Sequence, residues 1–197
     1  MKKIGIYGGS FSPPHNGHLS AARQFVSELD LDELLIMPSH ISPHKETDSS
    51  LTSRHRFEMA ELAFANLPRV KVSDYEIQKG DISYTAHTLS HFAKDGDLYF
   101  LCGTDMFLTL SRWYRPDIIF QNATIVLASR ENGSEEAILQ AKAAYEKDFN
   151  ARIIILNNLV LPLSSTEVRN ALREGLDVSR YLLPSVEDYI REHKLYL

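Results

Sequence analysis

Two histidines in a glycine-containing segment near the N-terminus are the side chains best suited to chemistry in this sequence. Residues 8–18 read Gly-Gly-Ser-Phe-Ser-Pro-Pro-His-Asn-Gly-His and follow a short apolar run at residues 3–7. Glycines after a strand let the chain turn sharply and bring backbone N–H groups close to a ligand. A helix expected at residues 18–29 adds the positive end of its dipole. With His15 and His18 aimed at the same oxygens, this segment predicts a site for phosphate groups.

Each part of this segment also occurs in proteins where it has no function. A strand followed by two glycines is a common turn, and an isolated surface histidine is usually only solvated. The combination of two histidines, two glycines and two prolines at one strand-to-helix junction favours the functional interpretation. The segment matches neither the Walker pattern nor the GxGxxG dinucleotide fingerprint.

A second candidate phosphate site lies at residues 163–169, which read Leu-Ser-Ser-Thr-Glu-Val-Arg. Ser164 and Glu167 have the spacing of a capping box, so a helix is expected to begin here. A capping box alone indicates no function, because many proteins contain one. Arg169, about one turn into the helix, can reach back to phosphates at the helix N-terminus, and its planar guanidinium suits phosphate geometry.

Strand-like and helix-like patterns alternate along the chain, and these elements must position the two segments. Apolar runs predict further strands at 34–37, 98–102, 124–128 and 152–156, and helical patterns cover 52–67, 135–149 and the C-terminal fifth. This alternation predicts an α/β fold, a single Rossmann-like parallel sheet with helices on both faces and a small C-terminal helical region. No linker or internal repeat divides the sequence, so residues 1–197 are expected to form one domain. Ligands of such sheets bind beyond the carboxyl ends of the strands.

Composition excludes several classes of function. The formal net charge of −5 argues against broad nucleic-acid binding. No apolar run approaches the roughly 18 residues of a membrane span, and no apolar signal region follows the N-terminal lysines. Cys102 is the single cysteine and cannot form an internal disulfide, so a reducing cytoplasm is the expected location.

Taken together, the two phosphate segments resemble the nucleotidyltransferase superfamily. Residues 15–18 are similar to its (H/T)xGH signature, and residues 163–169 are similar to its ISSTxxR signature. Over nearly the whole chain the resemblance is to the bacterial nicotinate-nucleotide adenylyltransferases, whose opening segment is similar to residues 8–19. Two positions depart from that pattern: Ser10 replaces a threonine and keeps the hydroxyl, and Ser12 replaces an aspartate and lacks the carboxylate.

Three further stretches resemble the acceptor side of that family. Residues 38–45 are similar to a loop ending in PPHK, whose basic end lies near the mononucleotide phosphate, and residues 83–85 are its SYT motif at a helix start. Residues 103–114 are similar to its G(A/S/T)D…WY stretch. The resemblance implies that Trp113 stacks on a pyridine ring and that Asp105 holds ribose hydroxyls. Without this context, Lys45 would be a solvated lysine, Thr85 a plain helix cap and Trp113 a core residue.

The resemblance assigns the site residues as follows. The catalytic residues are His15, His18 and Arg169. The ATP contacts are Gly8, Gly9, Ser10, Phe11, His15, His18, Gly103, Asp105, Ser164, Ser165 and Arg169. The contacts to the acceptor are His44, Lys45, Tyr84, Thr85, Asp105, Trp113 and Tyr114.

The implied reaction transfers AMP from ATP to nicotinic acid mononucleotide, giving nicotinic acid adenine dinucleotide and pyrophosphate in NAD biosynthesis. The acceptor phosphate attacks the α-phosphorus in line, so positioning and charge stabilisation do the work without an enzyme nucleophile. Mg²⁺ is expected to arrive with ATP, because the sequence has no dedicated metal cluster.

Other functions stay open at this point. One is a different adenylyl- or cytidylyltransferase, such as a phosphopantetheine adenylyltransferase, and another is a nucleotide-binding regulator without turnover. A class I aminoacyl-tRNA synthetase shares the HxGH motif, but this chain is short, acidic and without a KMSKS-like loop. The oligomeric state is also open, with a homo-oligomer among the alternatives.

Overall fold

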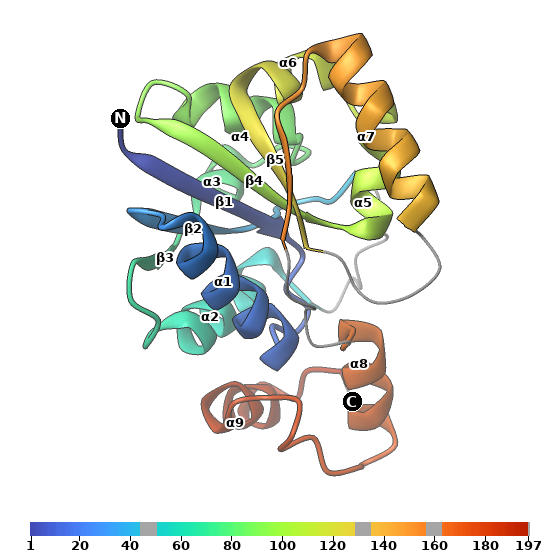
Figure 1. Ribbon diagram of the computed structural model, residues 1–197. Coiled ribbons are helices and arrows are strands. Elements are labelled where there is room, and N and C mark those ends of the chain that lie inside the picture. Colours follow the sequence, from blue (N-terminus) through green and yellow to red (C-terminus); the bar gives the residue numbers. More distant parts are fainter. Residues whose placement is uncertain (44–50, 129–134, 157–162, 197) are drawn as a thin grey trace.

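A six-stranded parallel sheet forms the centre of the computed structural model, which describes residues 1–43, 51–128, 135–156 and 163–196 (Figure 1). The strands are β1 Lys3–Gly9, β2 Glu33–Pro38, β3 Val70–Val72, β4 Asp97–Gly103, β5 Ala123–Ala128 and β6 Ile153–Ile155. Their order is β3-β2-β1-β4-β5-β6, and every adjacent pair is parallel, as the sequence predicts. The order reverses between β1 and β4, which makes their carboxyl ends the switch point of the sheet.

The helices join these strands and agree with the sequence pattern where they are long. They are α1 Asn16–Leu29, α2 Ser53–Phe64, α3 Tyr75–Lys79, α4 Thr85–Phe92, α5 Thr104–Thr109, the 3-10 turn η1 Leu110–Arg112, α6 Pro116–Asn122, α7 Glu135–Phe149, α8 Ser165–Arg173 and α9 Pro184–Glu192. The sequence predicts α7 with these bounds. It does not predict β3, α3, α5 or α6, since segments of three to seven residues are too short to show a hydrophobic period. Within the described residues, no helix is long and apolar enough to cross a membrane.

Two hydrophobic clusters cover the two faces of the sheet. Along β4, Leu101 belongs to the first cluster, with α1 and α2, while Phe100 and Cys102 belong to the second, with α4, α6 and α7 (Figure 1). Successive side chains of a strand point to opposite faces, which produces this alternation. Burial on both faces explains why the strands read as continuous apolar runs in the sequence.

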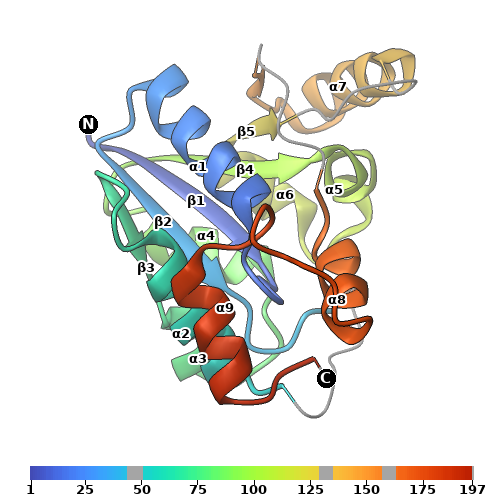
Figure 2. The same ribbon diagram turned by 90° about the horizontal axis from the view of Figure 1, so that it is seen from below.

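The C-terminal helices pack against the first cluster and return to the N-terminal half of the chain. Helix α9 lies beside α2 (Figure 2), where the Tyr189 hydroxyl donates to Glu58 and lies 2.7 Å from His55 Nδ1. Near the chain end, Tyr196 is buried and its hydroxyl lies 3.0 Å from Ser12 Oγ. The small C-terminal helical region predicted from the sequence is therefore confirmed, and it reaches the segment that follows β1.

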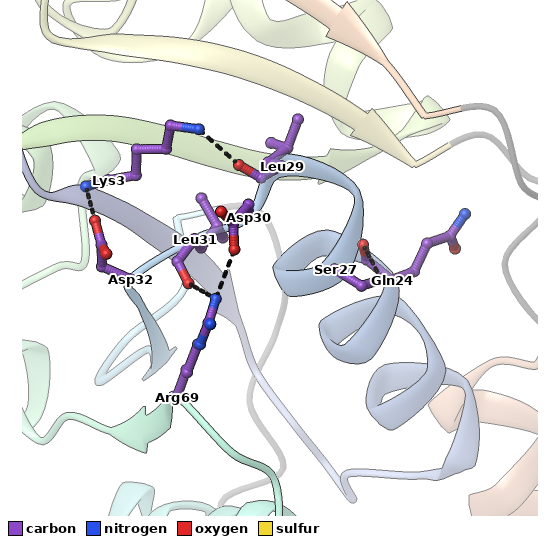
Figure 3. A network of polar contacts seen from close by, with 8 residues as sticks. All are labelled: Lys3, Gln24, Ser27, Leu29, Asp30, Leu31, Asp32 and Arg69. Carbon is purple, nitrogen blue, oxygen red and sulfur yellow. Dashed lines mark hydrogen bonds and ion pairs between the residues drawn. The ribbon is translucent and has the colours of Figure 1, made fainter.

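A polar network ties together the amino ends of β1, β2 and β3 (Figure 3). The Lys3 backbone N–H donates to Asp32 Oδ2 at 2.8 Å, and Arg69 Nη1 donates to Asp30 Oδ1 at 2.8 Å and to the Leu31 carbonyl at 3.0 Å. Exposed ion pairs of this kind add little stability. Their place at the amino ends of the strands puts them on the far side of the sheet from the switch point.

Candidate active site

A cavity of about 500 Å³ opens at the carboxyl ends of β1, β2 and β4. Four segments contribute most of its lining, namely residues 8–10, 39–43, 83–85 and 105–114. Its volume lies within the range of about 300–1,000 Å³ found for small-molecule sites. The switch point of the sheet therefore carries a site large enough for a nucleotide-sized ligand.

The cavity brings together predicted contacts from distant parts of the sequence. The predicted residues that line it are Gly8, Gly9, Ser10, Tyr84, Thr85, Asp105, Trp113 and Tyr114. Phe11 is instead buried in the first cluster, and Gly103 ends β4 as the N-cap of α5. His44 and Lys45 lie outside the described residues. The contacts of all these residues with substrates stay predictions.

Trp113 stands at the wall of the cavity and is half-buried. One side of the ring packs against the second cluster, with Phe100 edge-on at 6.4 Å between ring centroids. The indole N–H donates to Thr109 Oγ1 at 3.3 Å, which fixes the orientation of the ring. A half-buried tryptophan that packs on the core and lines a cavity can serve as a rigid stacking platform.

Helix α4 begins at Thr85, at the edge of the cavity, as the SYT motif predicts. The N-cap is Tyr84 rather than Thr85, so the interpretation of Thr85 as a plain helix cap is wrong. The Tyr84 ring lies against Tyr114, with 4.5 Å between centroids. The first amides of a helix have no partner within the helix, and its dipole favours negative charge there. This corner of the cavity therefore suits an aromatic ring that carries a carboxylate.

His15 and His18 cap helix α1 reciprocally. His15 is the N-cap, and its Nδ1 accepts from the His18 backbone N–H at 3.4 Å, while His18 Nδ1 accepts from the His15 backbone N–H at 3.2 Å. The two rings stack, with 3.7 Å between centroids. Helix α1 therefore begins at Asn16, two residues before the predicted start. Histidine side chains accept the capping hydrogen bonds that serine or aspartate side chains usually accept.

This capping arrangement also decides where the histidine protons lie. A neutral imidazole has one N–H and one acceptor nitrogen. Since each Nδ1 accepts a backbone hydrogen bond, the proton of each neutral ring is assigned to Nε2. Each neutral ring thus carries its N–H donor at Nε2, and phosphate oxygens can accept from such a donor.

The turn after β1 does not occur at the two glycines, which corrects the sequence interpretation. Gly8 and Gly9 continue β1 and pair with Met37 and Pro38 of β2. The left-handed residue is Phe11, with φ of 47°. A bulky side chain rarely adopts that conformation, and such strain is often found at functional sites. At Gly9 an added Cβ would lie 3.3 Å from the Phe11 ring, so the glycine makes room for this turn.

The N-terminus of α8 contacts the segment after β1 directly. Ser164 and Glu167 form the predicted capping box, which confirms that a helix starts here. Ser165 Oγ donates to the Pro13 carbonyl at 3.0 Å, and Arg169 Nη1 donates to the Ser12 carbonyl at 2.8 Å. The two predicted phosphate segments, about 150 residues apart in the sequence, therefore lie side by side.

Two buried ionisable residues near the cavity are absent from the sequence prediction. Arg56 on α2 is 1% exposed, and burial lowers the pKa of its guanidinium. Glu76 on α3 lines the cavity, and burial raises the pKa of its carboxyl group. A signal for Arg56 does exist in the sequence, because Met59, Ala60 and Ala63 follow it at the spacing of one apolar helix face.

No metal centre is formed by the described residues, among which no group of three or more His, Cys, Asp or Glu could hold an ion. Asp105 is a single exposed carboxylate at the start of α5. An all-protein Mg²⁺ site needs several oxygen ligands, which this single carboxylate does not supply.

Comparison with known proteins gives full-length similarities. The family model described as "Cytidylyltransferase-like" matches residues 6–171. The "Probable nicotinate-nucleotide adenylyltransferase" of Clostridium beijerinckii is 34% identical over 203 residues and covers 100% of both chains. The protein of the same name from Shewanella frigidimarina is 35% identical, covering 98% of this chain and 99% of its own.

Solved structures share the fold. The Plasmodium falciparum nicotinic acid mononucleotide adenylyltransferase complexed with NaAD superposes with a TM-score of 0.75 at 21% identity, covering 100% of this chain and 98% of its own. The same enzyme complexed with APC gives the same values. At this identity the structural likeness concerns the fold alone, and it agrees with the parallel α/β sheet described above.

Proposed function

The chain belongs to the cytidylyltransferase-like family and, within it, to the nicotinate-nucleotide adenylyltransferases, and we propose that it transfers AMP from ATP to nicotinic acid mononucleotide. The products are nicotinic acid adenine dinucleotide and pyrophosphate, in a step of NAD biosynthesis. The observation that carries this proposal is the contact of α8 with the Pro13 and Ser12 carbonyls, in the segment that connects the cavity-lining residues 8–10 to the histidine pair. The segment after β1 thus suits phosphates, and the start of α4 suits an aromatic carboxylate.

The reaction needs donors at defined places rather than an enzyme nucleophile. An oxygen of the acceptor phosphate forms a bond to the α-phosphorus of ATP, and the bond from that phosphorus to the bridging oxygen breaks, so pyrophosphate leaves. The Nε2–H groups of His15 and His18 and the guanidinium of Arg169 serve the triphosphate oxygens. Preorganised donors of this kind stabilise charge as it moves to the leaving group.

The acceptor occupies the other end of the cavity. Its pyridine ring stacks on Trp113, its carboxylate faces the amides at the start of α4, and Asp105 holds ribose hydroxyls. Lys45, with His44, meets the mononucleotide phosphate. Mg²⁺ enters as part of the nucleotide substrate and neutralises phosphate charge. The chain acts as one domain over residues 1–197 in a reducing cytoplasm.

Pyrophosphate release with defined pairs of substrates tests this proposal. We expect turnover with ATP and nicotinic acid mononucleotide, less with nicotinamide mononucleotide, and none with 4′-phosphopantetheine. Replacement of ATP by CTP covers the cytidylyltransferase alternative. Turnover with another pair alone would reassign the enzyme within the family, and ATP binding without turnover on any acceptor would indicate a regulator.

A further inference from the structure

Arg56 joins two loops that follow the neighbouring strands β1 and β2 and border the cavity. Its Nη1 donates to the Ser10 carbonyl and its Nη2 donates to the His40 carbonyl, each at 2.9 Å. Ser10 follows β1, and His40 follows β2. Because the guanidinium is planar and rigid, its two nitrogens set the distance between the two carbonyls.

The cost of burying this charge is not recovered by an ion pair. None of the ion pairs within the described part of the chain includes Arg56, and its Nε has no hydrogen-bond partner there. A buried charge whose hydrogen bonds go only to neutral carbonyls is a poor way to gain stability, even with the attraction of the Glu76 carboxyl group. The arginine therefore needs an explanation other than stability, and the carbonyls that it holds supply one.

The His40 loop is held from other sides as well. His40 Nδ1 lies 3.0 Å from Ser53 Oγ at the start of α2, and the His40 backbone N–H donates to Ser83 Oγ at 2.8 Å. Ser83 shares a side-chain hydrogen bond with the buried Glu76, which also accepts from Thr88 at 2.6 Å. A polar network, in which Arg56, Glu76 and Thr88 are buried and the other side chains half-buried, thus connects the loop after β1, the loop after β2 and the start of α4.

We propose that Arg56 is a positioning residue that sets the separation between the loop carrying the triphosphate, residues 8–10, and the loop approaching the acceptor, residues 39–43. Arg56 acts through the Ser10 and His40 carbonyls and does not touch the substrates. This role rests on the proposed adenylyl transfer, in which each of these loops holds one of the two reactants.

The consequence for the reaction follows from the in-line geometry. Each loop can bind its own substrate without the other, so affinity for either substrate alone depends little on their separation. Attack on the α-phosphorus depends strongly on it, since a misplacement of about 1 Å can cost about 10²-fold in rate. The effect of Arg56 should therefore appear in kcat and not in KM.

The test compares Arg56→Met and Arg56→Lys with Met59→Ala. Met59 is fully buried in the first cluster on the same helix, so its truncation weakens the core and leaves both nitrogens of Arg56 in place. We expect kcat to fall about 10²-fold in Arg56→Met, with both KM values within about threefold of wild type. Arg56→Lys keeps the charge but has one nitrogen in place of two, so it should recover only part of the rate. Met59→Ala should lower Tm and leave kcat of the folded enzyme unchanged.

Amide hydrogen exchange provides a readout that needs no turnover. The Ser39 N–H donates to the Gly9 carbonyl at 3.0 Å, so its exchange reports whether the two loops stay together. In Arg56→Met this amide and that of His40 should exchange at least about tenfold faster, while in Met59→Ala they should not. Arg56→Lys provides the same measurement if Arg56→Met does not fold, because it also removes one of the two hydrogen bonds to the Ser10 and His40 carbonyls.

These experiments distinguish a failure of the proposed function from a failure of the proposed role of Arg56. If the wild type does not turn over ATP with nicotinic acid mononucleotide, the proposed function fails. The hydrogen-exchange rates then test by themselves whether Arg56 holds the two loops together. Unchanged kcat in both folded Arg56 variants of an active enzyme would overturn the proposal, as would unchanged exchange of Ser39 and His40. Equal losses of kcat in Met59→Ala and Arg56→Met would also overturn it, because a general loss of stability would then explain the effect.

Discussion

The two nitrogens of the His15 ring have separate tasks under the proposed function, and an asparagine at this position can distinguish them. Nδ1 caps α1 by accepting from the His18 N–H, and Nε2 is the donor assigned to phosphate. An asparagine side-chain oxygen can take the place of Nδ1, since asparagine is among the preferred N-cap residues. It has nothing at the place of Nε2. His15→Asn therefore keeps the cap and loses the donor, whereas His15→Ala loses both.

The expected magnitudes differ for the two tasks. Loss of an N-cap costs about 1 kcal/mol, and in a chain of this length 1 kcal/mol lowers Tm by about 2–4 °C. His15 is only 2% exposed, so truncation to alanine also leaves a small void that adds to this loss. Removal of one preorganised donor lowers turnover by about 10²–10³-fold. Both variants should show the loss of turnover, and only His15→Ala should show the lower Tm.

Two measurements test these roles: Tm, from thermal unfolding monitored by circular dichroism, and kcat, from steady-state pyrophosphate release. Near-normal kcat in His15→Asn would remove the Nε2–H group from the mechanism. A Tm of His15→Asn as low as that of His15→Ala would refute the capping role of Nδ1. Both measurements use the full chain and compare His15→Asn and His15→Ala with the wild type.

Four other predictions follow from the site. His18→Ala should lower turnover about 10²–10³-fold with the fold intact, and a folded variant with normal turnover would exclude this residue from the reaction. Trp113→Ala should weaken acceptor binding with ATP affinity nearly unchanged; a large fall in Tm with unaltered acceptor affinity would instead indicate a core role. Nicotinic acid mononucleotide should have a kcat/KM at least about 10²-fold above that of nicotinamide mononucleotide, because a carboxamide leaves a donor at the start of α4 poorly paired. Equal values would contradict the assignment of the carboxylate to the start of α4. Burial raises the pKa of Glu76 in the folded state, so the wild type should lose stability relative to Glu76→Gln as pH rises above the usual glutamate pKa. If the difference in unfolding free energy between the two proteins did not change with pH, the pKa of Glu76 would not be raised.

The sequence by itself determines the features that depend on local physics. Apolar runs alternating with helical periods indicate the parallel α/β fold, and the bounds of α7 agree with its pattern. The capping box at Ser164 is likewise local, because Glu167, three residues along, supplies its hydrogen bonds. The family resemblance also depends on short contiguous motifs, which is why it is visible without coordinates.

Only the tertiary structure decides how distant segments meet. Nothing near Arg56 in the sequence indicates that its guanidinium spans the Ser10 and His40 carbonyls, and nothing near Ser12 predicts its contact with Arg169. The turn after β1 is made at Phe11 rather than at the glycines because the parallel pairing with β2 extends through Gly9. Such contacts join atoms that are far apart along the chain, so packing of the sheet and its helices selects them, and no local pattern of residues contains that information.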